Sequence, residues 1–227
     1  MPPVITFIGW HNSGKTTLTS QVVARLKEKG YTVAVIKSTK ETGIETDQPQ
    51  TDTATYRGVG ADSVALLAPD QLIIRGKPPA RDLLTLARRY FFDLDIVIAE
   101  GFKHAAQVPK IEVRRGGDSP LLRDQVEGVV AVATDQPLAD GIVFRLDQSR
   151  EIADFIETRL LTDPKTPASQ IALTLNGESL PLPAPLRHQL AAAMQSLLAP
   201  LHPSLDQETL EINLRCRHAS EKPLPEE

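Results

Sequence analysis

VITFIGWHNSGKTT, residues 4–17, is the most informative part of this sequence for its fold. An apolar run over residues 4–8 leads into Gly9, four further residues, and the tripeptide Gly-Lys-Thr at 14–16. This spacing is the pattern of a phosphate-binding loop that joins a buried strand to a helix. The glycines let successive backbone N–H groups face an anion, and the start of the helix adds its positive dipole end. The stretch therefore predicts an α/β fold that binds phosphate groups.

The loop supplies most of the contacts expected with a nucleoside triphosphate. Lys15 places a positive charge on the β- and γ-phosphates, and Thr16 offers its hydroxyl to Mg²⁺. An ordinary glycine-rich turn is the alternative, but apolar residues recur at helical spacing after the loop, at positions 18, 22, 23 and 26. The predicted nucleotide-binding residues of the loop are Gly9, His11, Asn12, Ser13, Gly14, Lys15, Thr16 and Thr17.

Length and composition narrow the class of protein. The 227 residues allow one large domain, or one domain with an appendage, and 41% hydrophobic residues suffice for a core. The net charge of −4 offers no basic surface of the kind that nucleic acids require, so no nucleic-acid partner is expected. The single cysteine, Cys216, cannot form an internal disulfide. No apolar run reaches the roughly 18 residues of a membrane span, so we expect a cytoplasmic protein without a membrane partner.

Strands and helices alternate after the loop. Gly30 ends the first helix, and the β-branched run at 31–36 predicts a second parallel strand, buried on both faces of the sheet. The polar segment 37–55 is either a switch or substrate loop or a plain surface loop. The pattern predicts a phosphate-loop NTPase whose mostly parallel, doubly wound sheet has helices on both faces. Further strands are expected at 63–67, 72–74, 96–99, 110–113, 128–133 and 142–146, and helices at 80–92 and 149–161, the last capped by Asp147.

Composition divides the chain into four parts. Residues 1–161 form the predicted nucleotide-binding domain, and the segment TDPKTPAS at 162–169 has the composition of a linker. Residues 170–218 are predicted to form a small α+β accessory module that docks a partner or extends a dimer. Residues 219–227 are expected to be a disordered tail. The module would contain a hairpin of strands 171–175 and 179–182, a helix at 186–198 and a strand at 210–214.

Acidic residues follow two of the predicted strands. Glu100 stands at the carboxyl end of strand 96–99, where a carboxylate completes the Mg²⁺ site through a bound water or activates the attacking water. Asp135 follows strand 128–133, at an edge where a carboxylate can accept from both N1–H and the exocyclic amine of guanine. The alternative role of Asp135 is to cap a turn or a helix.

Three segments together resemble a known family, the molybdopterin-guanine dinucleotide biosynthesis adaptor (MobB) family of phosphate-loop GTPases. They are residues 9–17, 100–103 (EGFK) and 131–135 (AVATD), and the resemblance extends over about residues 3–161. Asp47 begins a matching Asp-x-Pro-x-x-Asp-Thr pattern, and Arg57 a matching Arg-x-x-Gly-Ala pattern. The chain departs from the family at residues 38–40, which are Ser-Thr-Lys in place of the usual histidines, and at Thr55 in place of an arginine.

The resemblance implies GTP and Mg²⁺ as ligands, slow hydrolysis and a homodimer. It also implies assistance to molybdopterin guanylyltransferase, the enzyme that attaches GMP to molybdopterin. Thr16, Glu100 and Asp47 are then the expected metal-site residues, Glu100 and Asp47 serve hydrolysis, and Asp135 reads guanine. Turnover is expected to be slow because neither an arginine finger nor a water-positioning glutamine is identifiable.

Two alternative functions remain at this point. One is an ATP-dependent ligase or kinase of a small metabolite on the same fold, for which the polar segment 37–55 would be a substrate lid. The other is a GTPase metallochaperone for nickel enzymes, although the sequence has no Cys/His cluster with ligand spacing. Preference for guanine or adenine separates the first alternative from a GTP-binding adaptor.

Overall fold

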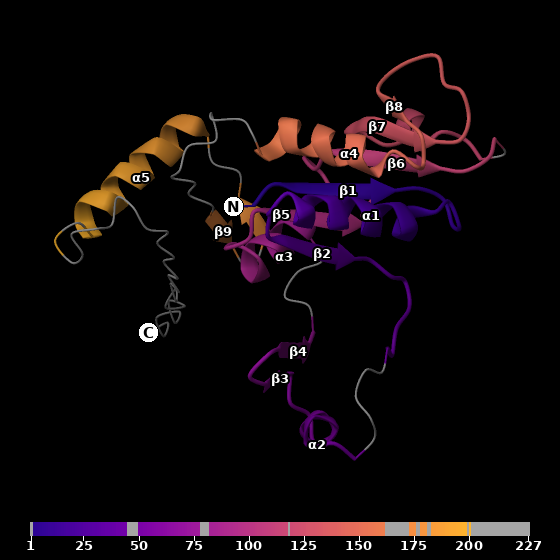
Figure 1. The fold of residues 1–227 in the computed structure, drawn as a ribbon. Coiled ribbons are helices and arrows are strands. Elements are labelled where there is room, and N and C mark those ends of the chain that lie inside the picture. The colour runs from indigo at the N-terminus through magenta and orange to yellow at the C-terminus, as the bar shows by residue number, and fades with distance from the viewer. Residues whose placement is uncertain are drawn as a thin grey trace, which may run out of the picture. The chain divides into compact units, whose positions relative to one another are not determined.

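A six-stranded parallel sheet carries the predicted loop at the carboxyl end of β1. The computed structural model describes residues 2–44, 50–77, 82–117, 119–161, 173–175, 178–180, 183–198 and 200. The strand order is β2-β5-β1-β6-β7-β8, and every neighbouring pair is parallel (Figure 1). The strands are β1 (Val4–Ile8), β2 (Val33–Lys37), β5 (Ile96–Glu100), β6 (Lys110–Arg114), β7 (Val129–Thr134) and β8 (Val143–Phe144).

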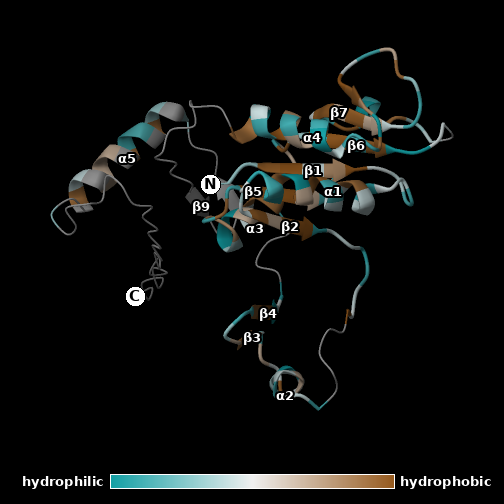
Figure 2. Ribbon diagram, viewed as in Figure 1, coloured by the Kyte–Doolittle hydropathy of each residue, from teal (hydrophilic) through white to brown (hydrophobic). Residues whose placement is uncertain are grey.

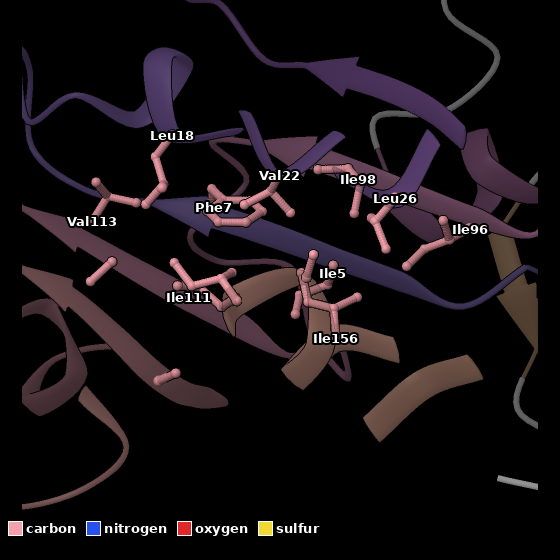
Figure 3. Packing of buried hydrophobic residues seen from close by; sticks show 14 residues of the cluster. Ile5, Phe7, Leu18, Val22, Leu26, Ile96, Ile98, Ile111, Val113 and Ile156 are labelled. Carbon is pink, nitrogen blue, oxygen red and sulfur yellow. The ribbon is translucent and has the colours of Figure 1, made fainter. Parts of the chain in front are cut away.

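Two helices cover one face of this sheet, α1 (Lys15–Glu28) and α4 (Ser149–Ile156). Figure 2 shows hydrophobic residues along β1 and a mixture of hydrophobic and hydrophilic residues on both helices, as expected for helices with one buried face. Side chains from the strands and helices interdigitate in this layer (Figure 3). Its buried members are Ile5, Phe7, Leu18, Val22, Leu26, Ile96, Ile98, Ile111, Val113, Ala131, Ala133, Ile152, Ala153 and Ile156.

The opposite face of the sheet packs against α3 (Leu83–Tyr90). Successive residues of a strand point to opposite faces, so Val4 belongs to this layer while its neighbour Ile5 belongs to the other. The buried members of this second layer are Val4, Ala34, Leu83, Ala87, Val97, Ala99 and Val108. Helices therefore lie on both faces, which confirms the predicted doubly wound α/β architecture.

A fully buried carboxylate, Glu112 of β6, holds the segment that leads from β6 to β7. Its two oxygens accept from the backbone N–H groups of Leu122 and Arg123, each at 2.9 Å. These residues begin the short 3-10 helix η1 (Leu122–Asp124). A buried N–H group left without a partner costs about 1–3 kcal/mol, so the carboxylate fixes the position of this segment. The sequence patterns did not single out Glu112.

Two predictions for the segment after α1 are wrong in part. β2 lies at the edge of the sheet, where Val35 is 50% exposed, and is not buried on both faces. A β-branched run suits an edge strand and a central strand alike, so its composition does not give its place in the order. The polar segment predicted as a loop over 37–55 already contains the start of helix α2 (Asp52–Gly58). Thr51 starts this helix because its hydroxyl accepts from the Ala54 N–H group at 3.3 Å.

Asp147 does not cap α4, contrary to the prediction. Gln148 occupies the N-cap position, and its side chain makes no capping hydrogen bond. The Asp147 carboxylate accepts instead from the guanidinium of Arg145, with Nε at 2.9 Å and Nη2 at 3.0 Å. The preceding strand is also shorter than predicted, Val143–Phe144 instead of 142–146. The helix itself is confirmed, because α4 continues into a π-helical turn, Glu157–Leu161.

The remaining elements lie outside the parallel sheet. β3 (Ser63–Leu67) and β4 (Leu72–Gly76) pair antiparallel, so these two predicted strands form a hairpin with each other. β9 (Leu173–Leu175) and β10 (Glu178–Leu180) also pair antiparallel, which confirms the hairpin predicted after the linker. The chain divides into two compact units, of which the first holds β1 to β10 and the second holds α5 (Ala184–Leu198).

Three predicted segments lie outside the described residues, namely the linker, the strand at 210–214 and the tail. The division into domains therefore stays a prediction. Within the described ranges, no helix has the length and apolar character needed to cross a membrane.

Candidate functional site

The phosphate loop turns sharply between β1 and α1. Asn12 and Gly14 both have positive φ values, 58° and 88°, and α1 begins immediately after Gly14. Glycine adopts this conformation without the steric cost that other residues carry, which accounts for Gly14. Gly9 is needed for a second reason, because a Cβ atom there would collide with the carbonyl oxygen of Val113 in β6. The loop therefore sits directly against β6.

The side chain of Lys15, the first residue of α1, folds back over residues 10–13 of the loop. Its ammonium donates to the carbonyl oxygen of Trp10 at 2.6 Å and to Ser13 Oγ at 3.4 Å. Burial lowers the pKa of Lys15 from its ordinary value, Glu100 opposes that shift and Lys37 adds to it. The loop oxygens hold the charge where the phosphates of a nucleotide would lie. Among the other predicted loop residues, Ser13 is buried, Gly9 and Gly14 are half-buried, and His11, Asn12, Thr16 and Thr17 are exposed.

Thr16 and Glu100 meet beside the loop. The Thr16 hydroxyl donates to Glu100 Oε1 at 2.9 Å, and the Glu100 side chain is only 11% exposed. The parallel register pairs Phe7 of β1 and Lys37 of β2 with Glu100, so three adjacent strands end together here. A hydroxyl and a carboxylate are hard oxygen donors that Mg²⁺ accepts together with phosphate oxygens. The donor set fits that metal.

Lys37 completes this cluster, and the sequence patterns assigned it no role. Its ammonium lies 3.4 Å from Glu100 Oε1 and 3.5 Å from Thr16 Oγ1. The side chain is 59% exposed, so it can move without breaking buried contacts. Its position at the carboxyl end of a strand is the signal that could have identified it, the same signal that pointed to Glu100.

The aromatic residue of the loop ties two neighbouring segments together. The Trp10 indole N–H donates to the carbonyl oxygen of Pro120 at 2.9 Å. Pro120 belongs to the segment that Glu112 fixes from within the sheet. Lys103 follows β5 in the chain, and its ammonium lies 5.7 Å from the centre of the Trp10 ring. These contacts brace the loop on both sides.

A hollow of about 440 Å³ opens on the β6 side of the loop, and this volume lies in the range of small-molecule sites. Arg115, directly after β6, reaches into it and lies close to Gly14. The sequence patterns assigned this arginine no role. The lining residues are Gly14, Thr17, Leu18, Gln21, Arg25, Arg115, Leu146, Asp147 and Ser149.

Asp135 directly follows β7, which lies two strands from β1 in the sheet. Its Oδ1 accepts from the Gly116 N–H group at 2.9 Å, and this hydrogen bond is the main cause that lowers the pKa of its carboxyl group. It lines a second hollow, of about 600 Å³, at the ends of β7 and β8. Asp147 lines both hollows. The last predicted site residue, Asp47, lies outside the described residues.

These features define a class, the α/β proteins with a phosphate-loop nucleotide-binding fold. A family model described as molybdopterin guanine dinucleotide synthesis protein B matches residues 4–135. The match spans more than half of the chain, and the chain belongs to this family. The resemblance stated from the sequence is thereby confirmed.

Individual relatives agree with the family. The chain is 29% identical over 163 residues to the molybdopterin-guanine dinucleotide biosynthesis adapter protein of Escherichia coli K12, with 69% of this chain and 92% of that protein covered. It is 33% identical over 162 residues to the protein of the same name from Haemophilus influenzae, with 70% and 89% covered. A crystal structure of molybdopterin-guanine biosynthesis protein B has a TM-score of 0.57 and 28% identity over 69% of this chain and 98% of that chain.

Proposed function

We propose that this protein is a GTP-binding adapter in molybdopterin guanine dinucleotide biosynthesis and that it hydrolyses GTP slowly. The main support is the hydrogen bond from the Thr16 hydroxyl to Glu100 Oε1, 2.9 Å long, beside the phosphate loop that leads into α1. Loop N–H groups and the helix dipole suit the phosphates, and Lys15 adds a charge-assisted contact. The choice of GTP follows from the family, whose name gives a guanine dinucleotide as the product.

Thr16 and Glu100 are the proposed holders of Mg²⁺, with Asp47 added from the family pattern. When bound by these residues, Mg²⁺ would supply positive charge that offsets the negative charge of the phosphates during hydrolysis. Glu100 would also orient the attacking water, because its carboxylate can accept a hydrogen bond from it. Lys37 can turn toward the γ-phosphate because its side chain is exposed, and its ammonium already lies near Glu100 Oε1 and Thr16 Oγ1.

The proposed protein partner is molybdopterin guanylyltransferase, because the adapter relatives carry the name of the pathway in which GMP is attached. Purified guanylyltransferase is expected to be retained on immobilised adapter and to elute with salt. An unrelated phosphate-loop protein on the same resin is the control. Equal passage of the enzyme through both columns, with and without GTP, would contradict the adapter role.

A homodimer is the proposed assembly, and the hairpin β3–β4 is its proposed contact. Ladder positions pair Leu66 with Ile73 and Leu67 with Leu72, and all four side chains are at least 40% exposed. An isolated two-stranded hairpin is marginally stable in water, so its apolar faces need cover. A second copy presents the same exposed apolar side chains at Leu66, Leu67, Leu72 and Ile73, and a two-fold axis places such a patch against itself. The further dimer surface predicted in the accessory module stays a prediction.

Loss of the loop ammonium should abolish nucleotide binding. In Lys15→Ala the charged contact to the β- and γ-phosphates disappears, and each such hydrogen bond contributes about 1.5–3 kcal/mol. We expect GTP affinity, measured by titration calorimetry with Mg²⁺, to fall by about a hundredfold or more. The exposed Lys40→Ala serves as the matched control, with affinity unchanged. Wild-type affinity in Lys15→Ala would remove the nucleotide site from this loop.

Glu100→Gln should separate metal dependence from nucleotide binding. The amide keeps the size of the side chain but loses the charge that attracts Mg²⁺ and aligns water. We expect GTP affinity in EDTA to stay within about threefold of wild type, while the gain on adding Mg²⁺ shrinks and turnover drops by about tenfold or more. Glu41→Gln, at an exposed position, is the control. If Mg²⁺ dependence and turnover both match wild type, Glu100 does not hold the metal.

A charge on the hairpin should break the dimer. Leu67 is 79% exposed, so Leu67→Glu leaves the monomer fold intact but places a carboxylate opposite its own copy in the proposed interface. Light scattering after size exclusion is expected to give the mass of two chains for wild type and of one chain for Leu67→Glu. Phe92→Glu, at a 44% exposed position outside the hairpin, should remain dimeric. A dimeric Leu67→Glu would remove the hairpin from the interface.

A further inference from the structure

The hollow beside the loop lies on the side opposite the proposed metal site. In the sheet, β1 is flanked by β5, which ends in Glu100, and by β6, which is followed by Arg115. The hollow extends from Gly14 and Thr17 of the loop to Leu146 and Asp147, which join β8 to α4. Figure 1 shows α1 and α4 on the same side of the sheet. The hollow is lined by several residues of α1 and by Ser149, the first residue of α4.

The hollow has the chemistry of a nucleoside site. If the phosphates of a nucleotide bind the loop N–H groups, the sugar and base can extend toward either the β5 side or the β6 side of the loop. The β5 side is occupied by the charged Glu100 and Lys37, whereas the β6 side offers the apolar side chains of Leu18 and Leu146. Arg115 adds a guanidinium, a planar cation that stacks on aromatic rings and pairs with phosphate. A purine therefore fits the β6 side.

Asp147 carries the hydrogen-bonding pattern that guanine needs. Its two carboxylate oxygens accept from Nε and Nη2 of Arg145 at 2.9 and 3.0 Å. Guanine presents the same fork of two donors, since N1–H, C2 and the exocyclic amine form a guanidine fragment. Both side chains of the pair are more than 70% exposed, and exposed ion pairs contribute little to stability. Guanine can therefore replace Arg145 at low cost.

Adenine lacks this fork of donors. It would leave the carboxylate without a partner after Arg145 has moved away, and a site built for a hydrogen bond rejects a ligand that leaves its polar groups unpaired. Asp135 is placed differently, because it is bonded to the Gly116 N–H group and lies outside the lining of the hollow at the loop.

We propose that Asp147 is the residue that selects guanine, with Arg145 occupying its carboxylate until the base arrives and Arg115 covering the base. This assignment rests on the proposed binding of GTP to the loop. It names a residue that the sequence treated only as a helix cap.

The test exchanges the carboxylate for an amide. Asparagine offers one donor and one acceptor, which match the C2 oxygen and N1–H of xanthine but not the two donors of guanine. We expect Asp147→Asn to lose about tenfold or more in affinity for a non-hydrolysable GTP analogue and to gain about tenfold for the xanthosine analogue. Displacement of a fluorescent nucleotide with Mg²⁺ measures both, and the exposed Asp140→Asn is the matched control, expected to bind as wild type does.

The outcomes separate the two levels of the proposal. No binding of any triphosphate by wild type would overturn the proposed function itself. Guanine preference in wild type that persists in Asp147→Asn would keep the GTP site but overturn the assignment of Asp147. A switch to xanthine in Asp135→Asn, and not in Asp147→Asn, would overturn it in favour of Asp135.

Discussion

The parallel pairing of β1 with β5 is the constraint on which the site depends. This register sets Phe7 beside Glu100, so the chain leaves β1 into the phosphate loop at the level where the carboxylate emerges from β5. Thr16, in the first turn of α1, then meets Glu100 at 2.9 Å. Shifting a strand by one residue turns each side chain to the other face and would direct Glu100 away. The buried residues of α1 and α4 hold this register from one side and those of α3 from the other.

Three cationic side chains surround the loop, and contacts that a ligand can replace hold two of them, Lys15 and Lys37. Lys15 is bonded to loop oxygens, Lys37 contacts the proposed metal ligands, and Arg115 stands at the opposite side. In the proposed complex, the triphosphate would pair with these cations, and Mg²⁺ would pair with the oxygens of Thr16 and Glu100. The residues proposed to bind both ligands already lie together in the structure. Glu112 supports this arrangement from within the sheet through the segment that carries Pro120.

Much of the fold was predictable because the loop pattern fixes a strand, a turn and a helix at known positions. Glu100 could be placed beside the phosphate loop because the carboxyl ends of parallel strands lie at one edge of the sheet. Asp147 was assigned wrongly as a cap, since Asp before a helix has two uses and only the position of Arg145 decides between them. Lys37 stands at the end of a strand as Glu100 does, but the strand order that brings the two side chains together cannot be read from the local sequence. The edge position of β2 was missed for the same reason.

The most direct measurement is a crystal structure of the protein with Mg²⁺ and a non-hydrolysable GTP analogue. We expect the β- and γ-phosphates to lie on the loop N–H groups and Lys15. The metal should contact the Thr16 hydroxyl, and should contact Glu100 directly or through one water. Guanine is then found within hydrogen-bonding distance of Asp147. A nucleotide bound away from residues 9–17, or a metal held without Thr16 and Glu100, would contradict the account.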